Sequence, residues 1–330
     1  MNKTAFPPVS IIVCTRNRAA LLPRMIEQLC AQNYPQETFE IIIVDNCSTD
    51  ETPEVVQRFV RELSCPLRYV REDRSGVTFA RNRGAKEARY PNLAYLDDDC
   101  TVGENWLVQL VSGFELDEQV AVVAGRVDIA YDEQKIPPWL GPVSKRWLAE
   151  FNFPGSQPRL LDNPTYVCEG NMAISKKAWE SVGGFLGMDQ FSSPHVASQE
   201  IVYLLEKIKR RGGKVAFVPG AIADHHTIIP TRKQLLTRAY FHGVSSGILN
   251  YLLKGFSLLF VIFRVAINGV ATFVFLFLSF IFFFAFDRAT SMDFLLRAAM
   301  RLGRALSELH LAGSWRSVRA WVLAQRSQQD

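Results

Sequence analysis

The chain has 330 residues, 48% of them hydrophobic, and a formal net charge of +4. This length allows one large domain or two smaller ones with a sizeable core, and the small charge neither indicates nor excludes an anionic partner. We expect no nucleic-acid partner. The six cysteines show no CxxC pair and no metal-ligand spacing, which excludes a cysteine-based metal centre and favours buried thiols without disulfides in a reducing compartment.

The first hundred residues alternate short apolar runs with amphipathic patterns, which predicts strands alternating with helices. Such alternation is typical of an α/β fold with an open, mostly parallel sheet and helices on both faces. Ligands of these sheets bind beyond the carboxyl ends of the strands. The predicted strands cover residues 9–14, 41–44, 67–70 and 93–96, and the predicted helices cover 21–29, 50–63 and 76–88.

Three consecutive aspartates, Asp97, Asp98 and Asp99, follow the apolar run at 93–96. Carboxylates lose hydration on burial and repel one another, so a core position does not stabilise such a cluster. Hard oxygen ligands suit a divalent metal, Mg or Mn, which keeps one or two protein carboxylates and takes its other oxygens from phosphates and water. The alternative is a solvated, aspartate-rich turn.

Other polar residues follow the first two predicted strands. Thr15 and Arg18 come after the first strand, and Asp45 comes after the second. Guanidinium groups and a metal suit the phosphates of a nucleoside diphosphate, while a carboxylate such as Asp45 can accept hydrogen bonds from its base or ribose. The strand ends therefore predict a site for a nucleotide diphosphate.

Four sequence blocks stand in one order and spacing: VSIIVCTRNR at 9–18, IVDNCSTD at 43–50, ARNRG at 80–84 and LDDD at 96–99. Together they resemble the nucleotide-sugar half of glycosyltransferase family 2, in a membrane-associated bacterial-type member. The resemblance covers roughly residues 9 to 228. It implies the nucleotide-diphospho-sugar transferase fold and a reaction that inverts the anomeric centre.

The resemblance also implies roles for individual residues. Asp45 would contact the nucleobase, Asp97 would lie near the ribose, and Asp99 would bind the metal. Arg81 would lie near the diphosphate, although a solvated residue on a surface helix is the alternative, and Asp45 could instead form a turn that caps the next helix. The residues expected to bind the donor are Thr15, Arg18, Asp45, Arg81, Asp97 and Asp98.

The acceptor half resembles the same family in the blocks CEGNMAI at 168–174 and GGF at 183–185. Glu200 opens a predicted helix and matches the glutamate of the family's Glu-Asp pair, but Ile201 stands where the aspartate usually lies. Because that aspartate is often the general base, we expect Glu200 to be the catalytic residue, with Glu169 as the alternative.

Two further segments could serve the site. His225 lies six residues beyond a proline, a spacing common in similar proteins, and could complete the metal shell or contact the diphosphate, although a structural role is the alternative. Residues 131–166 are rich in Pro, Trp and Phe with little periodicity, which favours an ordered loop region facing the acceptor. Their tryptophans could instead pack in the core.

The C-terminal part is strongly apolar over residues 256–286, long enough at 265–286 for one membrane crossing. Arginine and lysine flank both sides, which favours a re-entrant hairpin bent near Asn268 and Gly269 over a single span. A buried helix of a soluble protein is the third possibility. Residues 294–309 predict an amphipathic helix on the membrane surface or against the catalytic domain. Residues 1–8 lack an apolar run, so we expect no secretory signal and a cytoplasmic catalytic domain at the inner membrane.

These observations predict a metal-dependent inverting glycosyltransferase with a nucleotide-diphosphate sugar donor and a lipid-linked or glycan acceptor, acting in surface polysaccharide synthesis. The expected domains are a nucleotide-sugar half at 1–125, an acceptor half at 126–228, and a membrane region at 229–330. The alternatives are a polyprenyl-phosphate sugar synthase and a catalytically silent membrane adaptor.

Overall fold

The structure, a computed structural model, describes residues 6–130, 136–141, 144–145, 147–186, 199–254, 258–285 and 287–313. The chain forms two compact units. We call the first the sheet unit; it comprises residues 1–130, 149–187 and 200–227. The second, the helical unit, comprises 131–148, 188–199 and 228–330.

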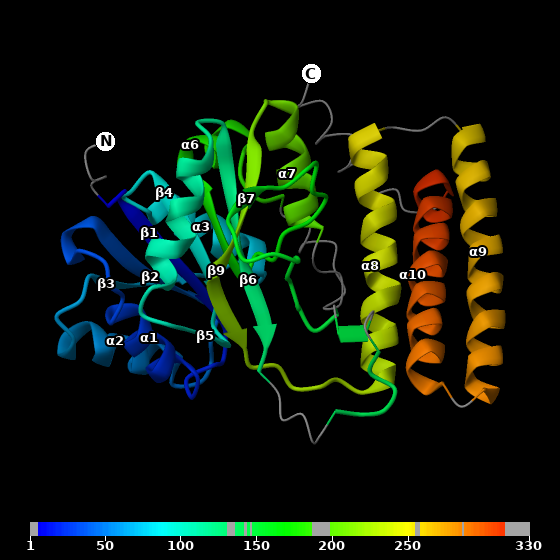
Figure 1. Ribbon diagram of the computed structural model, residues 1–330, viewed down its shortest axis with the longest axis horizontal. Helices are drawn as coiled ribbons and strands as arrows, with labels where there is room; N and C mark the ends of the chain where they lie inside the picture. The colour runs from blue at the N-terminus through cyan, green and yellow to red at the C-terminus, as the bar shows by residue number, and fades with distance from the viewer. Residues whose placement is uncertain are drawn as a thin grey trace. The chain divides into compact units, whose positions relative to one another are not determined.

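The sheet unit is built on one twisted sheet, which within the described residues has nine strands (Figure 1). Their order is β3-β2-β1-β4-β8-β6-β9-β5, and β7 pairs with β9 outside this order. The strands are β1 (Val9–Thr15), β2 (Phe39–Asn46), β3 (Leu67–Glu72), β4 (Asn92–Asp97), β5 (Cys100–Val102), β6 (Val120–Ile129), β7 (Arg159–Leu160), β8 (Asn171–Ser175) and β9 (Lys214–His225).

Helices cover both faces of this sheet, as the alternation of apolar residues along the strands requires. Ile11 on β1 and Ile41 on β2 pack under one set of helices, while Ile12 and Ile42 point to the opposite face. The first face carries α1 (Leu22–Cys30), α2 (Thr52–Glu62) and α4 (Trp106–Ser112), and the second carries α3 (Val77–Glu87), α6 (Lys176–Ser181) and α7 (Glu200–Arg210). Short 3₁₀ helices η1 (Gln36–Thr38) and η2 (Gly113–Leu116) complete the unit.

The α/β class predicted from the sequence is confirmed. Strands β3, β2, β1 and β4 are all parallel to one another, as predicted for the nucleotide half. Beyond β4 the sheet is mixed, because β8 runs antiparallel to both β4 and β6, whereas β6 and β9 are parallel. Parallel neighbours place their carboxyl ends at one edge, so the polar residues after β1, β2 and β4 gather there.

In its described part, the helical unit contains three long helices, α8 (Arg232–Lys254), α9 (Leu258–Phe284) and α10 (Arg288–Gly313), with α10 between the other two (Figure 1). Helix α9 runs unbroken through Asn268 and Gly269, so the predicted hairpin bend at these residues is wrong. The side chain of Asn268 donates to the carbonyl of Arg264 one turn earlier, so its polar group is satisfied within the helix. The stretch Phe263–Phe284 is long and apolar enough to cross a membrane.

Helix α10 packs against both α8 and α9, and the predicted position of its amphipathic stretch on the membrane surface or against the catalytic domain stays a prediction. Its backbone approaches α8 closely, because a Cβ at Gly243 would collide with the carbonyl of Met300, and one at Gly303 would collide with that of Tyr240. Small residues spaced four apart are typical of helix pairs that pack in membranes. Both ends of the apolar run expected at 256–286, Phe256 and Phe286, lie outside the described residues. Three of the arginines that follow this run, Arg316, Arg319 and Arg326, lie outside them as well.

The expectation that the cysteines form no disulfide is wrong for one pair. Cys30 at the end of α1 is bonded to Cys65, which lies between α2 and β3, with the two Cα atoms 5.6 Å apart. Helices α1 and α2 pack against each other on one face of the sheet, and this tertiary contact brings the two residues together. The spacing of the cysteines along the chain does not indicate this disulfide. Cys14, Cys47, Cys100 and Cys168 are free.

Candidate functional site

The aspartate triplet lies where β4 ends, and its three side chains have three different partners. The backbone of Asp97 is held by a hydrogen bond from its N–H to the carbonyl of Gly170. A Cβ at position 170 would collide with the carboxylate of Asp97, so glycine is needed for this close approach. The side chain of Asp97 remains 41% exposed. It is therefore held by the fold yet still accessible to a ligand.

Asp98 turns towards the end of β1. The hydroxyl of Thr15 donates to Asp98 Oδ2 over 2.7 Å. Burial raises the pKa of Asp98 to about 6, against the hydrogen bond from Thr15, which lowers it. The two predicted donor-binding residues Thr15 and Asp98 are thus brought together at adjacent strand ends.

Asp99 lies between a histidine and an arginine. Its Oδ1 is 3.1 Å from His225 Nε2, and its Oδ2 is 3.7 Å from the half-exposed guanidinium of Arg18. Burial opposes ionisation of Asp99, but the hydrogen bond and charge of His225 together with the charge of Arg18 outweigh it, so the pKa lies below its ordinary value. The neighbouring His226 turns to Thr101, with 2.8 Å between Nε2 and Oγ1.

Arg81 is buried on α3 among three carboxylates, which excludes the alternative of a solvated surface residue. Its Nη1 lies 3.1 Å from Glu200 Oε1 and 3.8 Å from Glu169 Oε1, and its Nη2 lies 3.7 Å from Asp97 Oδ1. Burial and the nearby Glu200 raise the pKa of Glu169, against the attraction of Arg81. Both carboxylates considered as the general base therefore meet at one guanidinium.

The ARNRG block builds this arrangement from within α3. Gly84 allows the helix to lie directly on β1, since a Cβ there would collide with Ile12. Asn82 donates from Nδ2 to the carbonyl of Phe185 over 2.8 Å and accepts from the N–H of Phe185 over 2.9 Å. This reciprocal pair ties α3 to the GGF block, where Gly183 and Gly184 adopt positive φ values of 80° and 78°.

Asp45 is fully buried, and both of its oxygens already have partners. Oδ1 accepts from the N–H of Ser48 over 2.9 Å, which is the local turn considered as the alternative, and Oδ2 accepts from the Tyr69 hydroxyl over 2.7 Å. Arg71 Nη1 lies 3.8 Å from Oδ2. A carboxylate has about four acceptor positions, so the two hydrogen bonds described leave Asp45 the capacity to accept another. Because Asp45 is fully buried, a base can reach it only once one of these side chains is displaced.

Tyr69 and Arg71 were not identified from the sequence. Both lie on β3, where Arg71 stands directly opposite Asp45 in the parallel register. The stretch LRYVRE predicts a strand but no register, so no local signal could have identified these two residues. The Asp45 environment therefore depends on the pairing of two strands.

Asn171 in the CEGNMAI block is a buried structural residue that the sequence analysis did not single out. Its Oδ1 accepts from Trp106 Nε1 over 2.8 Å, and its Nδ2 donates to the carbonyls of Arg126 and Ala221. It thereby joins α4, β6 and β9 behind the strand ends. Its role is to hold the sheet that presents the site.

The aromatic segment expected to face the acceptor divides between the two units. In the helical unit, the Trp139 ring packs on the Arg232 guanidinium at 5.5 Å and the Trp147 ring packs edge-on against His242. In the sheet unit, Phe151 and Phe153 pack on Phe217. These tryptophans thus contact helix α8, while the phenylalanines contact β9; residues 131–135 lie outside the described part.

The residues present fit a divalent cation. Asp97 has an exposed carboxylate, and Asp99 and His225 lie together beside it, a donor set of carboxylate and imidazole that suits Mn or Mg. Within the described residues there is no ready-made group of three or more His, Cys, Asp or Glu ligands. The site therefore suits an ion that takes most of its oxygen ligands from a phosphorylated ligand and water.

Comparison with known proteins agrees with this architecture. The chain is 30% identical over 131 residues to glycosyltransferase AglE of Haloferax volcanii, which is 39% of this chain and 42% of that protein. It is 23% identical over 257 residues to the glucosyl-dolichyl phosphate glucuronosyltransferase of the same organism, covering 74% of this chain and 78% of that one. The chain thus spans less than half the length of the AglE relative.

Solved structures share the fold. The mannosyltransferase PcManGT from Pyrobaculum calidifontis, in complex with GDP-Man and Mn²⁺, superposes with a TM-score of 0.56 at 18% identity, covering 98% of this chain and 81% of that chain. Residues 10–183, more than half of the sequence, match glycosyl transferase family 2. This match includes the four blocks around the strand ends and the acceptor-side block at 168–174. The chain therefore belongs to glycosyl transferase family 2.

Proposed function

We propose that this protein is a glycosyltransferase that moves a sugar from a nucleotide-diphosphate donor to an acceptor hydroxyl with inversion of the anomeric centre. The observation that carries the proposal is the buried guanidinium of Arg81, which meets Asp97 from the donor half and Glu200 from the acceptor half. The Arg81 guanidinium is thereby shared between a donor-side carboxylate and the candidate base. The proposed domain boundaries are those given above, 1–125, 126–228 and 229–330.

The donor would be held along the carboxyl ends of the parallel strands. Asp45 would accept hydrogen bonds from the base, and Thr15 with Asp98 would line the same pocket. Arg18 and Arg81 would stabilise the negative charge of the diphosphate, because a positioned guanidinium binds phosphate oxygens well. Asp97, half-exposed beside them, would lie near the ribose.

Asp99 and His225 would hold the divalent cation, Mg or Mn, and PcManGT was solved with Mn²⁺. When bound, such an ion supplies positive charge that stabilises the phosphate leaving group. The hydrogen bond from His225 to Asp99 keeps the pKa of that carboxyl low. Asp99 is therefore ionised, and ready to serve as a ligand, well below neutral pH.

Glu200 would act as the general base that takes the proton from the acceptor hydroxyl. The contact with Arg81 fixes the orientation of Glu200, which lies at the start of α7. Glu169 is the second candidate, because burial and Glu200 raise its pKa into a range suited to a base near neutral pH. Positioned base catalysis contributes about 10² to 10⁴ in rate.

A membrane location with a lipid-linked acceptor is supported by the two faces of α9. Phe273 and Phe277 point outwards, 76% and 65% exposed, whereas the polar Asn268, Thr272 and Ser279 are buried against the bundle. This distribution is the reverse of that in a water-facing helix and suits contact with lipid. The proposal includes a catalytic unit at the cytoplasmic face of the inner membrane, acting in surface polysaccharide synthesis.

A polyprenyl-phosphate sugar synthase is the second candidate. Glu200 already contacts Arg81, and an acceptor phosphate needs no strong base to take its proton, so this reaction does not depend on Glu200 being free to act as one. Product analysis separates the two reactions, since one forms a glycoside and the other a phosphate ester. A catalytically silent adaptor would form neither.

The experiment that tests the proposal is a screen of nucleotide sugars with and without Mn²⁺, read as thermal stabilisation of the full chain and as donor hydrolysis. A bound donor raises the melting temperature by mass action. Asp99→Asn should abolish the Mn²⁺-dependent part of both signals, whereas Asp73→Asn, an exposed carboxylate paired with Arg71, serves as the control. If no nucleotide sugar stabilises or is hydrolysed by the wild type, the proposal is wrong.

A further inference from the structure

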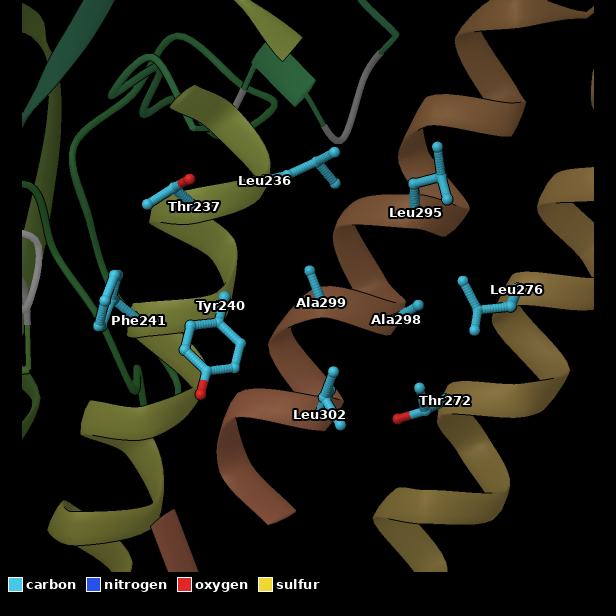
Figure 2. A pocket seen from close by; sticks show the side chains of 10 residues that line it. All are labelled: Leu236, Thr237, Tyr240, Phe241, Thr272, Leu276, Leu295, Ala298, Ala299 and Leu302. Carbon is cyan, nitrogen blue, oxygen red and sulfur yellow. The ribbon is translucent and has the colours of Figure 1, made fainter. Parts of the chain in front are cut away.

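A cavity of about 480 Å³ lies within the helical unit, between α8, α9 and α10 (Figure 2). We call it the bundle groove. Its volume falls within the range of about 300 to 1,000 Å³ that is usual for small-molecule sites. The lining is mainly apolar and includes Leu236, Tyr240, Leu276, Leu295, Ala299 and Leu302.

Hydroxyl groups lie at both ends of the bundle groove. Figure 2 shows Leu236, Thr237 and Leu295 at one end, and Thr272 at the other end, towards which the Tyr240 hydroxyl points. We call the latter the Thr272 end. Thr272 donates from Oγ1 to the carbonyl of Asn268 over 2.8 Å. Two hydroxyls therefore lie at the Thr272 end, against one at the other end.

A guanidinium lies outside the groove lining and is linked to the Thr272 end through Asn268. Arg301, the residue before groove-lining Leu302, donates from Nη1 to Asn268 Oδ1 over 3.1 Å. Asn268 thus contacts both Thr272 of the groove and Arg301. Its neutral amide cannot balance the charge of the arginine.

The charge of Arg301 calls for an anion. Its Nε–H is buried and lacks an acceptor among the described residues, and no described carboxylate forms an ion pair with it. Asp293, two turns earlier on α10, instead accepts from the N–H and hydroxyl of Ser144. The Arg301 side chain as a whole is only partly buried, but a buried N–H of a charged group without an acceptor is costly, so an anion that accepts from it would stabilise this end of the groove.

The bundle groove is also continuous with the surface expected to contact lipid. Leu276 and Leu302 line it and are 45% and 43% exposed, and Leu276 adjoins the outward Phe277 on α9. A hydrocarbon chain could therefore enter from the side. One cavity of this size accommodates one chain, which favours a single-chain lipid over a two-chain phospholipid.

We propose that the bundle groove binds the hydrocarbon chain of an isoprenoid phosphate, with the phosphate at Arg301. This inference rests on the proposed lipid-linked acceptor and assigns its recognition to residues of the helical unit. The chain lies on Leu276, Leu295 and Leu302, and the Tyr240 and Thr272 hydroxyls lie at the end that faces the phosphate.

The test measures binding of farnesyl phosphate, farnesol and inorganic phosphate to the full chain in phosphatidylcholine nanodiscs, without donor or metal. Arg301→Gln should weaken farnesyl phosphate binding about tenfold or more, because it removes hydrogen bonds to a charged group, and should leave farnesol binding unchanged. Leu302→Trp, at the exposed mouth, should weaken both lipids. Arg297→Gln, exposed on the same helix, is the matched control and should change neither.

Several outcomes overturn the inference. It fails if Arg301→Gln and Arg297→Gln have equal effects, if inorganic phosphate competes as well as farnesyl phosphate, or if a single-chain isoprenoid binds no better than phosphatidylglycerol. Far-UV circular dichroism and the melting temperature verify that each variant folds. Because no donor is present, failure of sugar transfer would sink the proposed function while this binding result still stands. Conversely, transfer to a lipid acceptor with an unchanged KM in Arg301→Gln would retain the function and reject the groove.

Discussion

Replacing Arg81 by methionine should destabilise the sheet unit strongly, because Arg81 is a buried cation among three carboxylates. Methionine keeps much of the volume and removes the charge. The contact with Glu200 at 3.1 Å is a charged hydrogen bond, and those with Asp97 and Glu169 at 3.7 and 3.8 Å are weaker. Breaking a buried ion pair from one side costs about 3 to 5 kcal/mol, because it leaves buried charge unpaired. We expect a loss of that size at pH 8.

The loss should shrink as the pH falls. In the variant, burial without a cation raises the pKa of the remaining carboxylates above their unfolded values. A raised carboxyl pKa favours the folded state at low pH and loses that contribution as the pH rises through the folded pKa. The variant should therefore recover part of its stability between about pH 8 and pH 5, whereas the wild type should change less.

Native-state hydrogen exchange is the suitable assay, because the two units need not unfold together. Exchange of β1 and β4 amides, read by mass spectrometry, reports the unfolding free energy of the sheet unit in the full chain. Arg83→Met is the control, since Arg83 lies on the same helix, is 43% exposed and pairs only with Glu87 within the described residues. Its effect should stay within about 0.5 kcal/mol. Equal losses in both variants, or an Arg81→Met loss that does not depend on pH, would refute the reasoning.

Three further predictions concern the sheet unit. Gly84→Ala should lower stability by about 1 to 3 kcal/mol in thermal unfolding, because its methyl group meets the side chains of β1, although alanine usually favours a helix. Arg74 lowers the pKa of Glu72 to about 2, so Glu72→Gln should lower the free energy of unfolding by about 1 to 2 kcal/mol above pH 4.5, a value already reduced because the arginine is exposed. The difference between variant and wild type, measured by urea titration, should vanish as the pH falls towards 2. Tyr69→Phe should change the affinity for the nucleotide, measured by calorimetry, because Tyr69 holds the Asp45 oxygen assigned to the base.

Matched variants control these three experiments. Gly103→Ala introduces a Cβ that meets nothing within 4 Å in the described structure, so it should leave stability almost unchanged. Asp73→Asn removes a carboxylate of an exposed pair, which contributes little to stability in water, so it should leave stability almost unchanged. Tyr90→Phe removes an exposed hydroxyl bonded to the carbonyl of Glu37 and should not alter nucleotide affinity. If a control variant changes the measured quantity as much as its test variant does, the corresponding argument is wrong.

The strands and helices around the donor half could be predicted from the sequence because their signals are local. Ile11 and Ile12, or Ile41 and Ile42, alternate between faces as a covered parallel sheet requires, and the helices between them have one apolar face each. The gathering of Thr15, Asp98 and Asp99 at one edge then follows from parallel strand direction. No tertiary information is needed for that step.

The rest of the site depends on distant pairings that local patterns do not encode. Arg81 and Glu200 are 119 residues apart, and the position of Arg81 on α3 gave no sign of whether it was buried. The Tyr69 and Arg71 contacts with Asp45 depend on strand register. In the three-helix bundle, by contrast, a local pattern does indicate the packing. Gly243 and Gly247 are spaced four apart, which is a sequence signal for close helix packing that could have been used.

The charges around Arg81 also constrain how donor and metal bind. One guanidinium already faces Asp97, Glu169 and Glu200, so a diphosphate placed beside it would add negative charge to a cluster whose cation is already shared. Burial makes this repulsion stronger than it would be in water. A divalent cation at Asp99 and His225 would offset the added charge, so each ligand should raise the affinity of the other by the same factor. A donor affinity that is equal with and without Mn²⁺ would mean that Arg81 alone balances the diphosphate, which its three carboxylate partners argue against.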